Sequence, residues 1–507
     1  MSKKIIELED LKKIIKKLKN NKKKIVLCHG VFDLLHVGHI KYFEEAKLNG
    51  DKLIVSVTSD EYVNKGPNRP AFNSHQRLEA IQALEVVDYV VLSKFSTAIN
   101  IIKEIKPDVY CKGPDYKDSK KDITGEIKNE IKNVKLIGGK TIFTSGATFS
   151  SSKLINQLEN QYSSNRKSAL SLVKKNFSFD QIKNFVDDFK KIKVLVIGEI
   201  IIDQYIFCEA LGKSGKEPVI VMKDIKTEQY LGGAGAISRH LSSFCKKISL
   251  LSMIGEKKEY LKDIKKDLPS NVSFNYITKN NSPTIFKKRY LDFLSLRKII
   301  GVDSLNDDSL NEKDEKLFNK FLRTNIPKHD LVVVSDYGHG LISNKSAKLI
   351  CKFSKYVALN AQINAANIGY HSMSKYQNID CLIVNEKELR HEMRDKKNTI
   401  EPMIKKFSKK QNIKNIIVTQ GVTGSLLYDK KKNQFTHCEA FAKTAIDKVG
   451  AGDTMLSLIA LFLKLNINKN LSMFVSSLGA AESVKNIGNK VALSKTKVLK
   501  AISHLLK

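Results

Sequence analysis

Apolar residues recur along the chain in different spacings, and each spacing predicts a different kind of element. Near the start, five of them recur at the three- and four-residue spacing of one side of a helix, with lysines on the other side. They are Ile5, Leu8, Leu11, Ile15 and Leu18. We therefore predict an amphipathic helix within residues 1–20. The continuous apolar run KIVLCHG follows it and predicts a buried strand that ends at a glycine.

From this strand onward, helix-period and strand-like segments alternate, separated by short turns that Gly, Asp or Pro mark. The segments are KYFEEAKLNG, KLIVSVTSD, HQRLEAIQALEVV, YVVLS, TAINIIKEIKP and VYCKG. Strand–helix alternation of this kind predicts a parallel sheet covered by helices on both faces. We expect this first domain to span residues 21–160.

A second domain of the same class follows a polar stretch. Residues 161–177 are rich in Ser, Asn and Lys, which predicts a linker. Ser178 and Gln181 have the spacing of a capping box and predict the start of a helix. The apolar strand KVLVIGEIIID then begins a second alternation, which we expect to occupy residues 178–507. The predicted fold class is therefore α/β with two doubly wound domains, and the two halves share no sequence repeat.

Length and composition agree with this organisation. A chain of 507 residues with 42% hydrophobic and 28% charged residues is typical of a globular protein of two or three domains. The longest apolar run, MLSLIALFL, is too short to span a membrane, and the N-terminus lacks a signal-peptide pattern. We expect a cytoplasmic location. Seven cysteines stand singly without a CxxC pair, which supports neither a disulfide framework nor a zinc site.

The net charge of +34 has two interpretations, nucleic-acid binding or a generally basic surface that suits anionic substrates. The lysines are spread over the whole chain, without interleaved aromatic residues or an arginine-rich cluster. We therefore favour the basic surface and expect no specific nucleic-acid partner and no membrane partner.

The first candidate for chemistry is the stretch HGVFDLLHVGH. Gly30 permits a tight turn after the strand, and Phe32 can anchor the loop to the core. His36 and His39 are three residues apart at a predicted helix start, where free N–H groups and the helix dipole attract anions. Two imidazoles there can donate hydrogen bonds to a phosphate, although an isolated HxxH pair is more often structural.

Three further segments favour a phosphate-binding role for the histidine pair over a structural one. They are VNKGPNRPAFNSHQRLEAIQALEVVDYVV, CKGPDY and TFSSSKLI. Together with the HxGH motif they resemble the nucleotidylyltransferase superfamily, over about residues 20–157. The resemblance implies a Rossmann-like sheet on which a substrate phosphate attacks the α-phosphate of ATP or CTP, pyrophosphate leaves, and Mg²⁺ screens charge. Asp33 would either help the metal or cap the turn.

The same resemblance assigns the residues of this first site. His36 and His39 would stabilise the transition state at the α-phosphate, and Lys65 and Lys112 would neutralise the triphosphate or the incoming sugar phosphate. The remaining residues would contact the nucleotide: Gly30, Phe32, Arg77, Ser150, Ser151 and Ser152.

A second candidate is DKVGAGDTM, a glycine-rich turn before an apolar helix. Gly450, Ala451 and Gly452 can present backbone N–H groups to a phosphate. Asp453 can accept a proton from a hydroxyl that attacks a γ-phosphate. Taken alone, an aspartate at a helix start is more often a cap.

Four segments precede that turn in a fixed order: IGEIIIDQY, GGAGA, NEKE and TQGVTGS. The same order is found in the ribokinase-like, phosphofructokinase-B type sugar kinases, which residues 190–507 resemble. The resemblance implies Asp453 as the base and Gly450, Ala451 and Gly452 as an anion hole. It implies that Asn385 and Glu388 organise Mg²⁺ indirectly. The remaining implied contacts are Thr419, Gly421 and Gly424 with the nucleotide, and Asp203, Gly232 and Gly233 with the sugar.

Two departures from that kinase pattern concern the sugar. Ala236 stands where relatives commonly have asparagine. Four amides replace an Asp-Pro-Lys turn and suit either sugar hydroxyls or turns: Asn360, Gln362, Asn364 and Asn367.

The pair of domains resembles the bifunctional heptose kinase/adenylyltransferases of bacterial lipopolysaccharide or capsule synthesis. In those enzymes the kinase domain usually comes first. We therefore expect the domain order of this chain to be reversed. Three interpretations remain open: a heptose enzyme that uses ATP in both halves, a cytidylyltransferase for another polyol or sugar phosphate, and an active transferase with a non-catalytic sugar-binding half. The oligomeric state stays open at this point, although the lids of ribokinase-like proteins often pair into homodimers.

Overall fold

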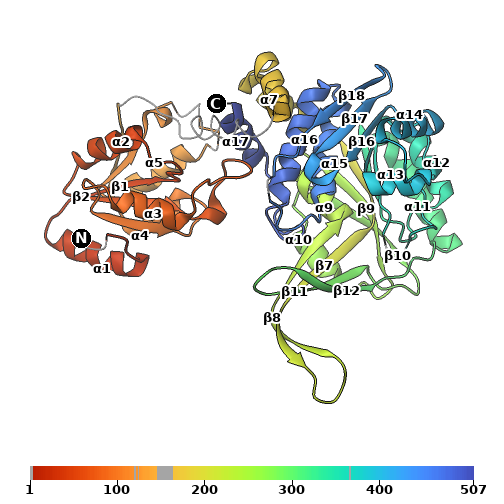
Figure 1. Cartoon of the computed structure of the whole chain (residues 1–507), viewed down its shortest axis with the longest axis horizontal. Coiled ribbons are helices and arrows are strands. Elements are labelled where there is room, and N and C mark those ends of the chain that lie inside the picture. The colour runs from red at the N-terminus through yellow and green to blue at the C-terminus, as the bar shows by residue number, and fades with distance from the viewer. Residues whose placement is uncertain are drawn as a thin grey trace. The chain divides into compact units, whose positions relative to one another are not determined.

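The N-terminal part of the chain folds around a parallel sheet of five strands in the order β3-β2-β1-β4-β5 (Figure 1). The computed structural model describes residues 4–118, 122–123, 125–145, 164–364, 367–442 and 444–506. They form two units, an N-terminal unit of Met1–Ser164 with Leu499–Lys507 and a C-terminal unit of Asn165–Val498.

The elements of the N-terminal unit follow the predicted alternation. Its strands are β1 (Ile25–Gly30), β2 (Lys52–Thr58), β3 (Tyr89–Ser93), β4 (Val109–Lys112) and β5 (Lys140–Phe143). Its helices are α1 (Leu8–Asn20), α2 (Val37–Lys47), α3 (Ser74–Gln82), α4 (Ala98–Ile105) and α5 (Glu126–Leu136), with the short 3-10 helices η1 (Asp60–Tyr62) and η2 (Pro114–Tyr116).

Helices bury both faces of this sheet. Alternate residues of each strand point to opposite faces, so each strand packs with helices on both sides. Val26 and Cys28 of β1 pack with residues of α2 and α3, whereas Ile25 and Leu27 pack with residues of α1 and α4. The strand order reverses between β1 and β4, which are hydrogen-bonded neighbours. Ligands of parallel α/β sheets bind at such a point, beyond the carboxyl ends of the strands. The ends here are Gly30 and Lys112.

The C-terminal unit is built on a sheet of nine strands in the order β10-β9-β6-β13-β14-β15-β16-β17-β18, of which β10 to β16 are parallel and the last two antiparallel. Its strands are β6 (Val194–Gly198), β9 (Ile248–Gly255), β10 (Val272–Lys279), β13 (Leu331–Asp336), β14 (Val357–Ala361), β15 (Cys381–Asn385), β16 (Asn415–Thr419), β17 (Ser425–Asp429) and β18 (Gln434–Cys438).

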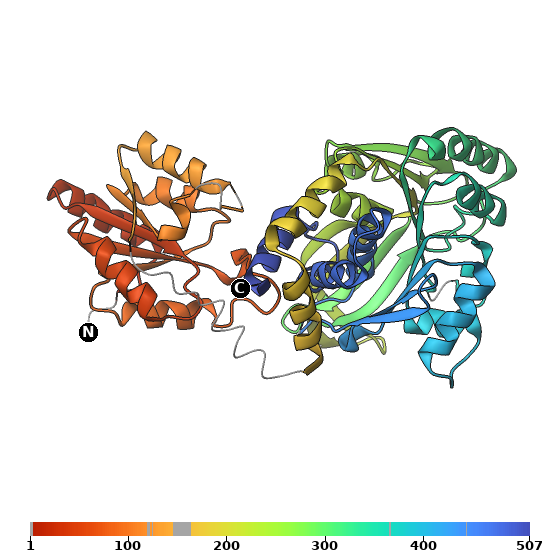
Figure 2. The same cartoon turned by 90° about the horizontal axis from the view of Figure 1, so that it is seen from above.

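Helices cover the two faces of this sheet in separate groups (Figure 2). Apolar residues of one group pack with the sheet in a large buried cluster. That group is α11 (Glu312–Asn325), α12 (Asn344–Phe353), α13 (Glu386–Met393) and α14 (Ile400–Gln411). The other group is α9 (Ala234–Ser242), α15 (Ala451–Lys464) and α16 (Lys469–Ser483).

The remaining described helices are short or lie where the two units meet along the chain, and most of α17 belongs to the N-terminal unit. They are α7 (Ser164–Asn176), α8 (Phe179–Asp188), α10 (Leu261–Asp267), α17 (Lys495–Leu506), and the 3-10 helices η4 (Phe189–Lys191), η5 (Ile326–Lys328), η6 (Met373–Lys375) and η7 (Gly421–Thr423). The predicted capping box is confirmed, since Ser178 and Gln181 bond each other's backbone N–H groups at the start of α8. Helix α7 lies inside the stretch that we predicted as a linker, and the predicted domain boundaries stay a prediction.

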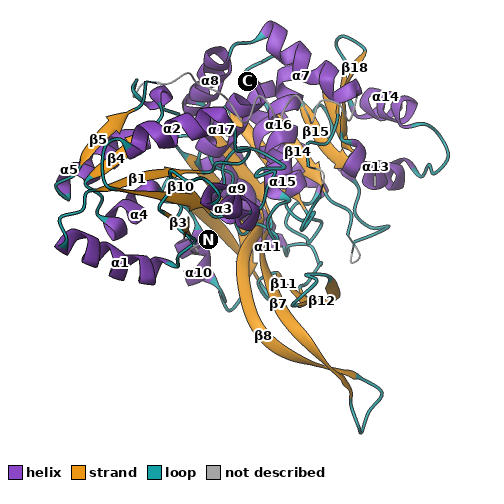
Figure 3. Ribbon diagram, turned by 60° about the vertical axis from the view of Figure 1, so that its left-hand side comes forward, coloured by secondary structure: helices purple, strands orange, loops and turns teal. Residues whose placement is uncertain are grey.

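A second sheet of four strands belongs to the C-terminal unit and contains a long hairpin (Figure 3). Its strands, in spatial order, are β12 (Lys298–Ser304), β11 (Phe286–Asp292), β7 (Ile200–Lys213) and β8 (Ile220–Gly233). Large apolar side chains are exposed on it: Leu211, Ile220, Ile225, Ile300 and Val302. None of the described helices is both long and apolar enough to cross a membrane. The seven cysteines, all within the described part, are free.

Candidate functional site

The first candidate site is built by the turn that joins β1 to α2. His36 is the N-cap of α2, and its Nδ1 accepts a hydrogen bond from the Gly38 N–H at 3.1 Å. A neutral His36 therefore carries its proton on Nε2. The His36 and His39 rings stack with centroids 4.0 Å apart and planes 18° apart. The structure thus brings the two predicted imidazoles together, both partly exposed, at a helix N-terminus.

Gly30 and Phe32 shape this turn. Phe32 is buried, has a φ of 50°, and its ring meets that of His39 edge-on at 5.4 Å between centroids. A Cβ atom on Gly30 would lie 2.9 Å from Cζ of Phe32, so glycine is needed for the ring to fold back under the turn. Phe32 therefore packs in the core beneath the loop, the place predicted for it, and its ring also contacts that of His39.

The electrostatic surroundings keep both histidines neutral at physiological pH. Burial lowers the pKa of His36, and the nearby Lys65 ammonium lowers it further. Burial, His36 and Lys65 together lower the pKa of His39 to about 3. Lys65 is thus close enough to add positive charge, and neutral imidazoles can donate a hydrogen bond each.

Arg77 does not occupy an open surface in this structure. Its buried guanidinium donates to the carbonyl of Val31 at 2.6 Å, to the carbonyl of Phe72 at 3.0 Å and to Asp60 at 2.5 Å. These contacts give Arg77 the role of bracing the turn, in contrast to the nucleotide contact that the resemblance implies.

Asp33 also holds the chain in place. Its Oδ1 accepts the N–H groups of Ala71 and Phe72 at 2.7 and 3.1 Å, and Arg69 lies 3.7 Å from its Oδ2. Of the two roles considered for Asp33, this geometry favours fixing a turn over holding a metal. Ser150, Ser151 and Ser152 lie outside the described residues.

Lys112 lies at the carboxyl end of β4, next to β1, but its ammonium is buried. Its Nζ pairs with Glu130 of α5 at 2.9 Å, and that carboxylate also accepts the Tyr110 hydroxyl at 3.0 Å. Burial alone would lower the pKa of the Lys112 ammonium, but Tyr110 and Glu130 raise it above its ordinary value. Glu130 therefore holds a charged lysine at the predicted position.

We expect Glu130→Gln to destabilise this corner of the sheet, because it leaves a buried cation without its partner. Breaking one half of a buried ion pair costs about 3–5 kcal/mol. Hydrogen–deuterium exchange should accelerate in β4 and α5. Glu85→Gln, at an exposed position of the same unit, should leave the exchange unchanged. Equal exchange in Glu130→Gln and the parent chain would contradict the pairing.

The second candidate site is the N-terminus of α15. Gly450 is its N-cap with a φ of 86°, and a Cβ atom there would collide with Oδ1 of Asn489. Ala451 and Gly452 follow at the partly or fully exposed start of the helix, and an added Cβ on Gly452 meets nothing within 4 Å. The Ala451 N–H donates to the carbonyl of Lys448 at 3.4 Å, so the open part of the turn lies at Gly452, where a phosphate can approach the helix N-terminus.

Asp453 lies in the first turn of α15 and is only 9% exposed. Its Oδ1 accepts the hydroxyl of Tyr337 at 3.0 Å. Burial raises the pKa of Asp453 to about 7, the Tyr337 hydrogen bond opposes this, and the charge of Asp203 adds to it. A carboxylate with such a pKa is suited to accept a proton near neutral pH.

Asp203 and the glycine pair meet where β7 and β8 pair. Asp203 forms an ion pair with Arg289 of β11 and is buried. A Cβ atom on Gly232 would collide with Oδ2 of Asp203, and one on Gly233, whose φ is 56°, would collide with the carbonyl of Glu199. The glycines thus leave room for the carboxylate that the resemblance places against the sugar.

Asn385 and Glu388 form the capping box of α13. Each side-chain oxygen accepts the other residue's backbone N–H, at 2.9 and 2.8 Å. Burial raises the pKa of Glu388 to about 7, and the charge of Asp453 contributes. No three His, Cys, Asp or Glu side chains gather as a metal site in the described part of the chain. Both side chains are used as helix caps, and the indirect role toward Mg²⁺ that the resemblance implies stays a prediction.

The predicted nucleotide contacts of the second site surround the turn after β16. Thr419 ends β16, and Gly421 has a φ of 63° in η7. Gly424 has a φ of 106°, and a Cβ atom there would collide with the carbonyl of Cys438. Thr419 pairs in register with Asn385, which places both at the same carboxyl edge of the sheet.

A model of the pfkB family of carbohydrate kinases matches residues 191–488, more than half of the 507 residues. The chain belongs to the pfkB family of carbohydrate kinases. A second model, of the cytidylyltransferase-like family, matches residues 27–168. The two matches confirm the predicted pairing of a nucleotidylyltransferase-like part with a pfkB part, and the predicted α/β fold class is confirmed as well.

Two curated relatives resemble stretches of different length in this chain. "Bifunctional protein HldE" of Aliarcobacter butzleri is 46% identical over 136 residues, which cover 26% of this chain and 28% of the relative. "Bifunctional protein HldE" of Campylobacter curvus is 30% identical over 308 residues, 60% of this chain and 64% of the relative. The chain thus spans less than two thirds of either relative, and the order of the two parts within them stays a prediction.

A solved structure supports the fold of the pfkB part. The crystal structure of phosphofructokinase-2 from Escherichia coli in complex with potassium aligns with a TM-score of 0.51 at 14% identity. The alignment covers 62% of this chain and all of that one. At this identity the likeness concerns the fold alone.

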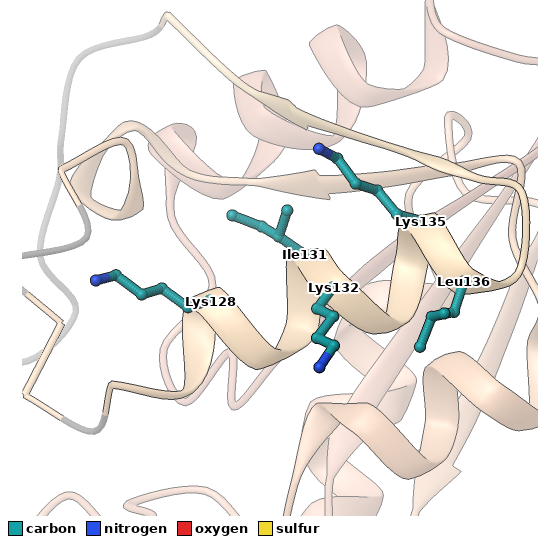
Figure 4. A pocket seen from close by; sticks show the side chains of 5 residues that line it. All are labelled: Lys128, Ile131, Lys132, Lys135 and Leu136. Atoms are coloured by element: carbon teal, nitrogen blue, oxygen red, sulfur yellow. The ribbon is translucent and has the colours of Figure 1, made fainter.

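A hollow of about 410 Å³ lies along α5 and is separate from both candidate sites (Figure 4). Five residues of this one helix line it: Lys128, Ile131, Lys132, Lys135 and Leu136. None of the predicted site residues is among them. Exposed lysines along one helix are typical of a solvated face, and we assign the hollow no role.

The two departures from the kinase pattern have different surroundings. Ala236 is buried in α9. Asn360 donates to the carbonyl of Ile383 at 2.9 Å, and Asn364 and Asn367 accept each other's backbone N–H. Of the two roles considered for these amides, the contacts favour the fixing of turns. Sequence reasoning missed Glu130 and Tyr337 as contacts of site residues, although Tyr337 lies in the distinctive run SDYGHG.

Proposed function

We propose that the chain is a bifunctional sugar-activating enzyme that phosphorylates a sugar or sugar phosphate and transfers a nucleotidyl group to a sugar 1-phosphate, such as a heptose 1-phosphate. We assign nucleotidyl transfer to residues 21–160 and phosphorylation to residues 178–507. One observation carries the proposal. In each unit the reacting side chains lie at the N-terminus of a helix, His36 and His39 at α2 and Asp453 at α15. The relatives named "Bifunctional protein HldE" support the pairing.

In the proposed transferase step, an oxygen of the sugar phosphate attacks the α-phosphorus of ATP or CTP. The bond from that phosphorus to the bridging oxygen breaks, and pyrophosphate leaves. Neutral His36 and His39 donate hydrogen bonds to the oxygens on which charge builds, and the N-terminus of α2 adds a favourable dipole. Lys65 and Lys112 supply positive charge for the phosphates.

In the proposed kinase step, a sugar hydroxyl attacks the γ-phosphorus of ATP, its proton moves to the Asp453 carboxylate, and ADP leaves. The N–H groups of Gly450 to Gly452 bind the transferred phosphoryl group. Mg²⁺, when bound with the nucleotide, neutralises phosphate charge. Nucleotides and sugar phosphates are cytoplasmic metabolites, so we propose that the enzyme acts in the cytoplasm.

The test is to incubate the purified chain with ATP or CTP and a panel of sugars, sugar phosphates and sugar 1-phosphates. ADP formation and pyrophosphate release are measured separately. Pyrophosphate release with ATP and a heptose 1-phosphate, together with ADP formation with a heptose or its phosphate, is the expected result. Release only with CTP would identify a cytidylyltransferase, and absence of ADP formation with every sugar would mean a non-catalytic kinase-like half.

We also propose that two chains associate through the four-stranded sheet, whose exposed apolar side chains are unusual for a free surface. Ile220 is 72% and Ile300 57% exposed. Either Ile220→Asp or Ile300→Asp should therefore shift the chain from dimer to monomer in light scattering at micromolar concentration. Lys223→Gln on the same hairpin should leave the mass unchanged. A parent chain that is monomeric at all concentrations would refute this proposal.

A further inference from the structure

The turn that follows β13 places a phenol beside the proposed base of the kinase step. Tyr337 is 7% exposed, and its hydroxyl donates to Oδ1 of Asp453 at 3.0 Å. The donor is neutral, since burial and the nearby Asp453 charge raise the pKa of Tyr337 well above its ordinary value. Asp453 thus has one oxygen fixed by a hydrogen bond from the turn after β13, and none of the predicted site residues lies on that strand or in that turn.

The backbone of Tyr337 is held from both sides by the side chains of the buried Glu199 and Asn367 and the partly buried Asn364. Oε2 of Glu199 accepts its N–H at 2.9 Å, and the Nδ2 atoms of Asn364 and Asn367 donate to its carbonyl at 2.9 and 2.7 Å. Glu199 follows β6 and Asn364 follows β14, the two strands on either side of β13. Three adjacent strand ends therefore converge on this one peptide.

The residues on either side of Tyr337 are fixed as well. Asp336 accepts the Gly338 N–H at 3.0 Å, the Tyr376 hydroxyl at 2.7 Å and the Lys375 ammonium at 2.6 Å. Gly338 has a φ of 70°, and a Cβ atom there would collide with Nδ2 of Asn367. The turn has little freedom to move, so the hydroxyl of Tyr337 is held at one position.

We propose that Tyr337 is a positioning residue for phosphoryl transfer, and that Glu199, Asn364 and Asn367 hold it. Its hydroxyl fixes the Asp453 carboxylate through Oδ1, which leaves Oδ2 to accept the proton of the sugar hydroxyl. Tyr337 keeps its own proton and does not touch the substrate. The inference rests on the proposed role of Asp453 as the base. Asn364 and Asn367, which stand where relatives have an Asp-Pro-Lys turn, would then hold the base in place and would not bind the sugar.

The hydrogen bond has a consequence for pH dependence. A donor stabilises the ionised carboxylate and lowers its pKa, against the burial that raises it. Tyr337→Phe removes the donor and keeps the ring. The pKa of Asp453 should then rise, so the acid limb of kcat should move to higher pH by about one unit. At pH values above the shifted limb, kcat should recover toward that of the parent chain, and the KM values should stay within about twofold.

The experiment measures ADP formation by the full-length chain from pH 5.5 to 9 with a sugar that turns over. It compares Tyr337→Phe, Asn367→Leu and the control Tyr370→Phe, whose side chain is 94% exposed. Asn367→Leu should shift the limb in the same direction by less, because it loosens the backbone around Tyr337 but keeps the Tyr337 hydroxyl. The control should match the parent chain. Circular dichroism and thermal melting establish that each variant is folded.

The outcomes separate this inference from the function on which it rests. An unshifted profile in Tyr337→Phe, while Asp453→Asn is inactive, overturns the inference alone. A raised KM for the sugar with unchanged kcat also overturns it, because Tyr337 would then contact the substrate. Undiminished turnover in Asp453→Asn, or no ADP formation by the parent chain with any sugar, overturns the proposed kinase function and the inference together.

Discussion

Asp453→Asn should lower the kcat of ATP-dependent phosphorylation by about 10²–10⁴-fold, the contribution expected of a general base. The amide has nearly the shape of the carboxylate and can still receive the hydrogen bond from Tyr337, but it cannot accept the proton of the sugar hydroxyl. The KM of the sugar should change little, because the substitution removes an interaction that matters in the transition state. Steady-state ADP formation measures both constants.

The parent enzyme should show the titration of the same group. With a pKa of about 7, Asp453 is mostly protonated below pH 7 and mostly ionised above it. Since the base acts only when ionised, kcat should rise about tenfold per pH unit below this value and level off above it. Asp263→Asn, an exposed position in α10, should leave the profile unchanged. Pyrophosphate release by Asp453→Asn should equal that of the parent chain and serves as an internal control.

Much of the fold could be predicted from the sequence, because local patterns determine it. In β1, Val26 and Cys28 alternate with Ile25 and Leu27, all four are buried, and such a strand must lie between two layers of helices. The capping box at Ser178 and Gln181 fixes a helix start through contacts within four residues. These signals need no knowledge of distant parts of the chain.

The candidate sites could be predicted only as far as their motifs. HVGH and GAGD show which side chains lie at a helix N-terminus, and the structure places them there. The partners of these residues depend on strand order. Tyr337 lies 116 residues from Asp453, and they meet because β13 and α15 pack together. No spacing in the sequence indicates that contact.

The same reason explains Arg77 and Lys112. A basic residue in a motif predicts a phosphate contact when its surroundings are unknown. The structure supplies those surroundings, in which Val31, Phe72 and Asp60 use the donors of Arg77 and Glu130 pairs with Lys112. For both residues the charge was predictable, whereas the group that holds it was not.

The imidazole pair of the N-terminal unit provides a second test with a large expected effect. The His36 and His39 rings stack with their centroids 4.0 Å apart. Two protonated rings at this distance would repel each other. With the pKa of His39 at about 3 and that of His36 below its ordinary value, both rings act as neutral donors. Pyrophosphate release should therefore show no loss from ionisation of His39 between pH 6 and 9.

His39→Ala should reduce the kcat of pyrophosphate release by about 10²–10³-fold, the cost of losing one preorganised donor to transition-state charge. His39→Asn, which keeps a donor near the same place, should lose less. His75→Ala is the matched control, because the His75 side chain is 77% exposed in α3. ADP formation by the same preparations reports on the C-terminal unit and should stay constant. If His39→Ala released pyrophosphate within about threefold of the parent rate, well below the loss expected for a donor, the imidazoles would be structural. The proposed transferase chemistry would then have to rest on Lys65, Lys112 and the N-terminus of α2.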